Sequence, residues 1–309
     1  MYHFIVNPDA GNRKTVKALE VVTRVFKEYG EAYVIHKTEK MGGARRAAAA
    51  LTGKRSDAEL DEKENSVSRS GKRLDEEEVK IVVFGGDGTL HEVLNGIVDP
   101  TRCVVGLIPS GMGNDFAASA GIPEDPEAAA KVILVDSAKK TDYLNVGGVR
   151  CMNVGGLGID VDVLVRYEKA KKKGKLKYLL CLIQSLFVYK GTNITVESDG
   201  VVTTHKALIA AACNGKQFGG GIKICPPAEI DDGKIDVNVV DKMGFFKIIG
   251  AFSRLMKGTI LKDKHAHYAR VDRIRVTSDK PFPVQLDGEI YENVAFDVSV
   301  GTDLKMYRP

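Results

Sequence analysis

A short apolar run that ends in three glycines constrains the fold of this chain more than any other feature. Residues Ile81–Phe84 have the composition of a buried strand, and Gly85-Gly86-Asp87-Gly88-Thr89 follows at once, with Leu90-His91-Glu92 opening a helix-like segment. Glycine lets the backbone approach a ligand closely, and the N–H groups of such a turn point towards an anion. Thr89 can cap the helix and donate to a phosphate. The pattern predicts a phosphate-binding strand–turn–helix unit, and a tight turn that binds nothing is the alternative.

Strand and helix signals alternate on both sides of this loop. The other predicted strands are Tyr2–Val6, Ala32–His36 and Cys103–Ile108, and the predicted helices cover Val16–Tyr29, Ala44–Leu51 and a segment that starts near Leu90. This order favours a Rossmann-like α/β domain, in which helices cover a parallel sheet. In such sheets ligands bind at the carboxyl ends of the strands.

Three further polar turns leave predicted strand ends at that edge. Asn7-Pro8-Asp9-Ala10-Gly11 follows the first strand, Thr38 follows the second, and Ser110-Gly111-Met112-Gly113-Asn114-Asp115-Phe116 follows the fourth. One nucleotide lying across the edge would touch all of them. The last turn is no dinucleotide fingerprint, because Phe116 stands where a third glycine is required, and the chain has no Walker A motif. Asn114 and Asp115 also suit simple helix capping.

The second half of the chain has a different character. Its predicted strands are Thr141–Gly147, Arg150–Val154, Asn193–Ser198, Ala207–Ala212, Lys234–Val240, Tyr268–Thr277 and Asn293–Val300, and its predicted helices are Lys175–Tyr189 and Gly244–Lys257. We therefore expect an α/β domain over residues 1–136 and a β-rich sandwich or distorted barrel over 137–300. No Pro-rich or Gly/Ser-rich linker separates them, so we expect a cleft between closely joined domains. The charged segment Gly53–Glu78 should be an exposed, mobile insertion.

Composition narrows the class of partner. A net charge of +4 is too weak to indicate nucleic acid, and the five cysteines lack the Cys-x-x-Cys spacing of zinc sites, which fits a reduced, cytoplasmic setting. The start of the chain does not have the pattern of a signal peptide. The apolar run Tyr178–Tyr189 is shorter than the about 20 residues that a membrane span needs.

Two acidic turns in the second half are candidates for chemistry. Asp231-Asp232-Gly233 and Leu286-Asp287-Gly288-Glu289 each contain Asp-Gly, which taken alone favours a plain hairpin. A phosphoryl transferase needs a carboxylate near the acceptor's proton and cations that neutralise developing charge. The turns offer such acids in a compact setting.

Taken in order, these residues resemble the soluble bacterial diacylglycerol kinases, which are related to sphingosine and ceramide kinases. The matching motifs are Asn7-Pro8-x-x-Gly11, Thr38, Gly85–Glu92, Gly111–Phe116, Gly219-Gly220-Gly221, Pro227-Ala228, Asp232-Gly233 and Leu286-Asp287-Gly288-Glu289. The resemblance implies an ATP-dependent lipid kinase, most simply one that converts diacylglycerol into phosphatidic acid. It also implies that residues 301–309 return to the first domain.

The resemblance assigns roles to individual residues. The implied ATP-binding set is Asn7, Pro8, Asp9, Ala10, Gly11, Thr38, Gly85, Gly86, Asp87, Gly88, Thr89, Leu90, His91, Glu92, Met112 and Gly113. Asp287 is implied as the general base. A structural Mg²⁺ is implied on the Asp232 side chain with the carbonyls of Glu229 and Lys234, and a second Mg²⁺ would arrive with ATP. Met112 departs from the family, which often has threonine there, so a side-chain contact to phosphate is lost.

The expected partner is a lipid at a membrane surface, met by a cytoplasmic enzyme that binds the surface peripherally. The basic stretch Lys169–Lys177 could dock on anionic lipid, and a solvated basic segment is the alternative. The sequence is also compatible with a homodimer. Two other functions stay open: a kinase of a small soluble acceptor such as NAD, and a non-catalytic regulator that binds nucleotide or lipid.

Overall fold

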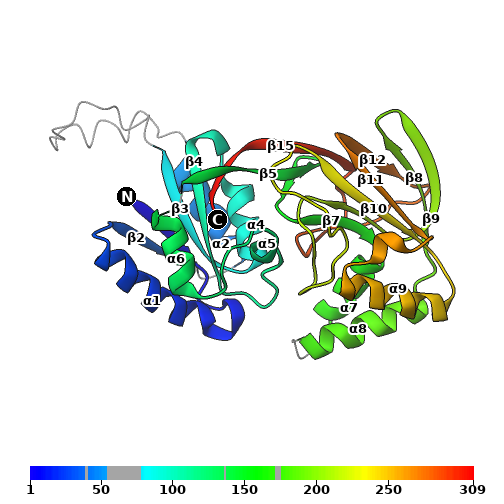
Figure 1. Cartoon of the computed structure of the whole chain (residues 1–309), viewed down its shortest axis with the longest axis horizontal. Helices are drawn as coiled ribbons and strands as arrows, with labels where there is room; N and C mark the ends of the chain where they lie inside the picture. The colour runs from blue at the N-terminus through cyan, green and yellow to red at the C-terminus, as the bar shows by residue number, and fades with distance from the viewer. Residues whose placement is uncertain (39–40, 54–77, 136, 171–174) are drawn as a thin grey trace.

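The computed structural model describes residues 1–38, 41–53, 78–135, 137–170 and 175–309 (Figure 1). Nearly all of the charged insertion expected over Gly53–Glu78 lies outside these ranges, as does part of the basic stretch Lys169–Lys177. Within the described ranges, no helix combines the length and the apolar character that a bilayer crossing requires.

The first half forms a parallel sheet, as the sequence predicts, and its strands lie in the order β2-β1-β3-β4. The strands are β1 (Tyr2–Val6), β2 (Tyr33–Lys37), β3 (Val79–Gly85) and β4 (Cys103–Pro109), and the helices are α1 (Lys14–Glu28), α2 (Gly43–Thr52), α4 (Asp87–Gly96), α5 (Asp115–Ser119) and α6 (Pro126–Val135). Val6 lies opposite Phe84, and Gly85 lies opposite Pro109. This register brings the turns after β1, β3 and β4 to one edge of the sheet.

Aromatic packing fixes the first helix on this sheet. Phe4 of β1 is fully buried, stacks on Tyr33 with ring centroids 4.7 Å apart, and meets Phe26 of α1 edge to face. Apolar residues of α1 recur at helical spacing on its inner face, which therefore packs against the sheet. In space, α1 packs beside α6, and α2 packs beside α4.

The second half is β-rich, with helices on one side (Figure 1). Its strands are β5 (Ala138–Val146), β6 (Val149–Cys151), β7 (Val154–Gly158), β8 (Thr192–Ser198), β9 (Val201–Cys213), β10 (Ile235–Asp241), β11 (Ala266–Val271), β12 (Arg273–Thr277), β13 (Val284–Leu286), β14 (Glu289–Tyr291) and β15 (Phe296–Tyr307). Its helices are α7 (Ile159–Glu168), α8 (Lys175–Val188) and α9 (Phe245–Lys257). The predicted β-rich sandwich class is therefore confirmed.

Strand alternation separates two apolar cores in this half. Val237 and Val239 of β10 face a core between the sheets, whereas Val240 faces a second core under the three helices. Ile209 of β9 and Ile248 of α9 belong to that second core. The helices are thus held on the sheet by their own apolar layer.

The two halves are joined by a long antiparallel pair, β5 and β15. Beyond this pairing, Lys305 and Met306 of β15 lie parallel to Val104 and Val105 of β4. The last strand therefore crosses from the second half into the first sheet, and both chain termini lie in the first half (Figure 1).

Three expectations on local structure were wrong. The single strand expected over Arg150–Val154 divides into β6 and β7, and that over Tyr268–Thr277 divides into β11 and β12. The Asp232-Gly233 turn is not a hairpin, because no named strand lies between Cys213 and Ile235, all of which are described. By contrast, Asp287 and Gly288 do form a hairpin turn between β13 and β14, with φ values of +53° and +91°.

Candidate active site

A cavity of about 820 Å³ lies between the two halves. Polar turns of the first half form one wall, and the β13–β14 hairpin with α7, α8, α9 and residues 218–222 forms the other. The predicted site residues that line it are Asn7, Asp9, Ala10, Gly11, Thr38, Gly86, Asp87, Gly88, Thr89, Glu92, Met112, Gly113 and Asp287. Those that do not are Pro8, Gly85, Leu90, His91, Glu229, Asp232 and Lys234. Leu90 is instead a core side chain.

The amino end of α4 faces this cavity without a side-chain cap. Gly86 occupies the N-cap position, so the expectation that Thr89 caps the helix is wrong. The Thr89 hydroxyl instead accepts a hydrogen bond from Asn7 Nδ2 at 3.2 Å, which ties the first turn to the Gly-rich turn. A ten-residue helix presents partial positive charge at such an end, and the uncapped N–H groups suit phosphate oxygens.

The two Gly-rich turns touch through their backbones. A Cβ on Gly86 would lie 2.8 Å from Gly111 Cα, and one on Gly111 would lie 2.5 Å from Gly86 Cα. Asn114, at φ +55°, closes the second turn by accepting from Gly111 N–H at 2.9 Å. Glycine is therefore required at both positions because any side chain would push the turns apart. Met112 is half exposed at the cavity wall.

Asp87 and Asp115 hold the site together through backbone N–H groups. The two oxygens of Asp87 accept from Asp115 N–H and Phe116 N–H, at 3.2 and 3.1 Å. Burial raises the pKa of Asp87 to about 6 in spite of these bonds. The Asp115 carboxylate crosses the cleft and accepts from Gln217 Nε2 and from the N–H groups of Gly220 and Gly221, at 2.7–2.9 Å. Asp115 thus connects the two halves through its carboxylate, and we call this set of hydrogen bonds the Asp115 tie.

Glu92 serves the neighbouring helix. Its two oxygens accept from the N–H groups of Gly42 and Ala44, at 2.8 and 3.1 Å, and so cap the start of α2. Thr38 is held beside the end of β1, where its N–H donates to the Val6 carbonyl at 2.9 Å. Both residues therefore shape the rim of the cavity near Asn7.

Asp287 is almost fully enclosed by donors. Its side chain is 2% exposed and accepts from His91 Nδ1 at 2.9 Å, from the N–H groups of Met152 and Asn153 at 2.8 Å, and from Cys151 Sγ at 3.2 Å. Burial alone would raise the pKa of Asp287, but the hydrogen bond and charge of His91 with the two N–H groups hold it below its usual value. The aspartate is therefore an anion, with little spare capacity to accept a further bond.

His91 links α4 to the hairpin of the second half. Its other ring nitrogen, Nε2, lies 2.7 Å from the Tyr291 hydroxyl. Glu289, from the same hairpin as Tyr291, faces the Gly-rich turn. Its Oε1 lies 3.3 Å from where a Cβ on Gly88 would stand. Burial raises the pKa of Glu289. The hairpin thus brings a second, more basic carboxylate to the cavity.

Asp160 is a site residue that the sequence analysis missed. It lies in the first turn of α7, is 4% exposed, and neither of its oxygens has a hydrogen-bond partner in the described structure. Burial raises its pKa to about 7. It sits where the main cavity meets a second cavity of about 50 Å³ that is lined almost wholly by apolar residues. Only its contrast with the apolar Ile159 and Val161 could have drawn notice in the sequence.

The wall beyond Asp160 is apolar and comes from three helices and a loop. Its members are Leu164 and Tyr167 of α7, Leu182 of α8, Phe218 and Ile222 of the loop, and Phe252 and Met256 of α9. The cavity therefore has a polar arm over the Gly-rich turns and an apolar arm between the helices.

The predicted metal set lies away from the cavity. Asp232 Oδ1 accepts from Lys234 N–H at 3.0 Å, and Oδ2 lies 2.9 Å from Arg270 Nη2. Nearby Asp236 has one buried oxygen without a hydrogen-bond donor. The carboxylates have the hard oxygen chemistry that Mg²⁺ prefers, and the unpaired oxygen leaves room for a cation. These residues therefore fit Mg²⁺ chemically, but the Arg270 guanidinium already neutralises part of the Asp232 charge and would compete with the ion.

Comparison with known proteins identifies the family. Residues 1–146 match the diacylglycerol kinase catalytic domain, and residues 154–303 match the YegS C-terminal NAD kinase beta sandwich-like domain. The "Probable lipid kinase YegS-like" protein of Xanthomonas oryzae pv. oryzae is 30% identical over 243 residues, covering 74% of this chain and 78% of its own. The chain belongs to the diacylglycerol kinase family of lipid kinases.

Other members of the family agree with this assignment. The diacylglycerol kinase of Bacillus subtilis is 27% identical over 289 residues, covering 92% of this chain and 88% of its own. A crystal structure of a diacylglycerol kinase from Bacillus anthracis str. Sterne covers all of this chain and 96% of its own, with a TM-score of 0.70 at 20% identity, which supports the fold. This lipid kinase is therefore an ATP-using enzyme, and the alternatives of an NAD kinase and a non-catalytic regulator fall away.

Proposed function

We propose that this lipid kinase transfers the γ-phosphoryl group of ATP to the hydroxyl of a diacylglycerol and releases phosphatidic acid. The observation that carries the proposal is the two-armed cavity. One arm is lined by Gly-rich turns and an uncapped helix end, and the other is lined by apolar side chains of α7, α8 and α9. A single cavity with both characters suits a reaction between a polyphosphate and a lipid.

The polar arm is the proposed nucleotide site. The N–H groups around Gly86–Thr89 would hold phosphate oxygens, and the turn Asn7–Gly11 with Thr38 would hold the rest of the nucleotide. Met112 and Gly113 would contribute through the backbone. Mg²⁺ bound with ATP would neutralise charge on the transferring group. Pro8, Gly85, Leu90 and His91 would support this site from outside the cavity.

The apolar arm is the proposed acyl-chain site. Its side chains offer no charge to a head group, and the adjoining 50 Å³ cavity extends the apolar surface towards the core under the helices. Asp160 stands at the junction of the arms as the one unpartnered acid there within the described structure. With a pKa of about 7, a protonated Asp160 can donate to an ester carbonyl of the lipid.

Asp287 is the proposed general base for the acceptor hydroxyl. It lines the cavity, although its four present donors leave room for a substrate proton only if the weak Cys151 contact opens. Glu289 is a second candidate, because it also lines the cavity and its raised pKa makes it the stronger base. Rates of the variants Asp287→Asn and Glu289→Gln distinguish which of the two carboxylates is the general base.

The structural Mg²⁺ remains part of the proposal, with Asp232 and the carbonyls of Glu229 and Lys234 as ligands. The nearby buried oxygen of Asp236 supports it. Such an ion would brace the turn before β10, where Gly233 N–H already donates to Asp142 at 2.7 Å. It would take no part in the transfer itself.

We further propose that the enzyme meets its lipid at the cytoplasmic membrane surface through α8 and α9, which lie side by side at one end of the second half (Figure 1). Leu180 and Ile183 of α8 and Ile249 and Met256 of α9 are exposed, and Lys247 and Lys257 are exposed beside them. Met256 also lines the apolar arm, so this surface continues into the cavity.

An acceptor panel tests the proposed reaction. The purified full chain is given γ-labelled ATP and Mg²⁺ with mixed micelles of diacylglycerol, a sphingoid base, a polyprenol or phosphatidylglycerol, and separately with NAD. We expect labelled phosphatidic acid from diacylglycerol at a rate at least tenfold above any other acceptor. A higher rate on another lipid would refute diacylglycerol as the substrate.

A further inference from the structure

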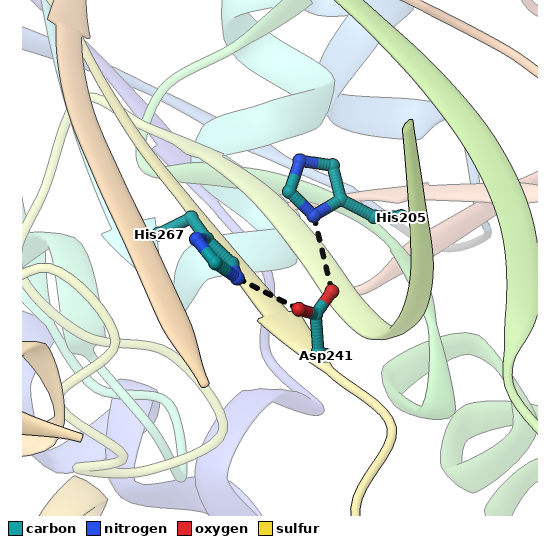
Figure 2. A group of neighbouring side chains, drawn as sticks. All are labelled: His205, Asp241 and His267. Atoms are coloured by element: carbon teal, nitrogen blue, oxygen red, sulfur yellow. Dashed lines mark hydrogen bonds and ion pairs between the residues drawn. The ribbon is translucent and has the colours of Figure 1, made fainter. Parts of the chain in front are cut away.

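Two histidines and an aspartate converge on the second half of the molecule, away from the cavity. His205 comes from β9, Asp241 is the last residue of β10, and His267 comes from β11 (Figure 2). β10 pairs antiparallel with both neighbours, and His267 lies directly opposite Val239. Residues opposite one another or two apart along a strand share a face. The sheet itself therefore sets the three side chains on one face.

The ligand atoms are already close together. Asp241 Oδ1 lies 3.0 Å from His205 Nδ1, and Oδ2 lies 2.7 Å from His267 Nε2, while all three groups offer atoms within 4.8 Å of one another. Ligands on a tetrahedral Zn²⁺, at about 2.0–2.1 Å from the ion, stand roughly 3.3 Å apart. Small side-chain rotations suffice to reach that spacing, and His267, which is 47% exposed, is free to make them.

The surroundings fit a ligated imidazole. His205 is only 10% exposed, and its second nitrogen, Nε2, lies 3.0 Å from the Thr203 hydroxyl. With Nδ1 on a metal, Nε2 carries the proton and donates a hydrogen bond to the Thr203 hydroxyl, and such a bond to the other ring nitrogen is how metal-bound histidines are usually oriented. Asp241 is fixed by its own N–H, which donates to the His265 carbonyl at 2.8 Å, and by a register shift at Val240/Asp241.

Two lysines lie close by in the chain but on the other face of the sheet. Lys206 follows His205 and Lys242 follows Asp241, so strand alternation turns both away. Both pack around Gly191, where a Cβ would lie 3.1 Å from Lys242 Cβ and 3.3 Å from Lys206 Cγ. Their charges therefore do not occupy the position between the two imidazoles.

We propose that His205, Asp241 and His267 form a binding site for a borderline divalent metal of the Zn²⁺ class, with water completing the coordination. Two imidazoles and one carboxylate suit Zn²⁺, Co²⁺ or Ni²⁺, whereas Mg²⁺ and Ca²⁺ prefer oxygen ligands alone. The site is distinct from the Mg²⁺ that accompanies ATP and from the Asp232 set.

Such an ion would link three neighbouring strands, β9, β10 and β11, at one edge of the sheet. Within the described residues β11 pairs with β10 alone, so a shared metal would tie it across β10 to β9. Asp241 also begins the connection to α9, which carries Phe252 and Met256 of the apolar arm. We therefore expect the ion to raise the stability of the wall that holds α9, without taking part in the transfer.

Metal titration of the full chain tests the site directly. The protein is used without a histidine tag, stripped with a chelator, and titrated with Zn²⁺ against a chromophoric chelator and with Co²⁺ by visible absorption. We expect one equivalent of tight binding, a tetrahedral Co²⁺ spectrum, and a Tm that rises with Zn²⁺. His267→Ala and Asp241→Asn should each weaken Zn²⁺ binding by at least about tenfold.

The matched control is His36→Ala. His36 lies 3.1 Å from His3 on β1 and β2, which makes a second histidine pair without a carboxylate. This variant should bind Zn²⁺ as the wild type does. The proposal is overturned if wild type and His267→Ala bind alike, if His36→Ala loses the tight equivalent, or if no saturable binding occurs because the three side chains are only hydrogen-bonded. None of these readouts depends on which lipid the enzyme phosphorylates.

Discussion

At the scale of single residues, two carboxylates of the cavity have different surroundings and therefore pKa values that shift in opposite directions. Asp287 accepts from His91 and two backbone N–H groups, which stabilise its charged form and lower its pKa. Glu289, two residues away, is an exposed residue whose carboxylate lies beside Gly88, and partial desolvation there raises its pKa. The same hairpin thus supplies a firmly held anion and a more basic group.

The first prediction separates these two acids. If Asp287 takes the proton of the acceptor, Asp287→Asn should lower kcat by about 10²–10⁴-fold with the Kd for ATP little changed. Glu289→Gln should cost less than about tenfold. Steady-state rates with ATP-binding measurements check this, and the Tm of each variant shows that it is folded. A large loss in Glu289→Gln with a small loss in Asp287→Asn would reverse the assignment.

The second prediction concerns Asp160. Because its folded pKa, about 7, lies above the unfolded value, the folded state binds the extra proton and loses stability as pH rises from about 4 to 7. Asp160→Asn removes this titration. The variant should match the wild type near pH 4–5 and exceed it at pH 8, by roughly 1–4 kcal/mol in the free energy of unfolding. Chemical denaturation at each pH measures the gap, and a gap independent of pH would contradict the account.

At the scale of elements, the site depends on how close the two Gly-rich turns come. Neither Gly86 nor Gly111 has a positive φ, so a side chain there would not strain the backbone by itself. The obstacle is the opposite turn, which lies less than 3 Å from where a Cβ on either glycine would stand. The turns are therefore a single unit built from β3, α4 and β4.

The third prediction follows from this contact. Gly86→Ala and Gly111→Ala should each weaken ATP binding by at least about tenfold, because the turns must separate to admit the methyl group. Gly250→Ala is the control, since a Cβ on this residue of α9 meets nothing within 4 Å, and alanine there should stabilise the helix slightly. Calorimetric titration of ATP gives the comparison. Unchanged affinity in both turn variants would show that the turns need not touch.

Local patterns were sufficient to predict most elements of this molecule. Short apolar runs located β1, β3 and β4, and helix-like segments located α8 and α9, to within a few residues, because those signals lie within the elements themselves. Helix α7 was not expected, since the segment Val154–Val165 mixes three glycines and two aspartates with its apolar residues and shows no clear helical period. Turn chemistry likewise predicted the hairpin at Asp287-Gly288 correctly and one at Asp232-Gly233 wrongly.

The side-chain contacts that define the site could not be predicted from local sequence patterns. His91 meets Asp287 from 196 residues away, and Asp115 meets Gly220 from 105 residues away. Asp160 is buried near Gln285, and neither oxygen of its carboxylate makes a hydrogen bond of normal geometry among the described residues. Such properties arise from the packing of the two halves, which no window of sequence contains.

At the scale of the whole molecule, the cavity exists because two halves are held at a fixed distance. The β5–β15 pair is one connection, and the Asp115 carboxylate with three donors of the 217–221 loop is another. Arg150 adds a third by donating to the carbonyls of Leu94 and Ile97. The polar and apolar arms of the cavity are thus aligned by hydrogen bonds between the two halves.

The fourth prediction tests the Asp115 tie. Asp115→Ala leaves the N–H groups of Gly220 and Gly221 without their acceptor, so the loop should loosen from α5. We expect a lower Tm and higher KM values for both ATP and lipid. Asp125→Ala is a comparison at the exposed start of α6, where the acid caps only its own helix through Ala128 N–H. Equal KM values in wild type and Asp115→Ala would remove the tie from the account.

The fifth prediction concerns helices α8 and α9, which we propose to face the membrane. Ile183→Ser combined with Ile249→Ser should reduce binding to anionic vesicles several-fold and lower activity on vesicle substrate, with little change for a short-chain, water-soluble diacylglycerol. Val201→Ser is the control, since Val201 is exposed to a similar degree on the β8–β9 hairpin. Sedimentation with vesicles measures binding. Equal effects of the double variant and the control would place the docking surface elsewhere.

The central claim is that one cavity brings ATP and a diacylglycerol together for direct transfer. The most direct measurement is phosphatidic acid formed per ADP released, from γ-labelled ATP and diacylglycerol micelles, by the wild type and by Met256→Asp at the mouth of the apolar arm. The account predicts one phosphatidic acid per ADP in the wild type, and in the variant a loss confined to the KM and rate for diacylglycerol with ATP binding intact. ADP release without labelled lipid, or a variant as active as the wild type, would contradict it.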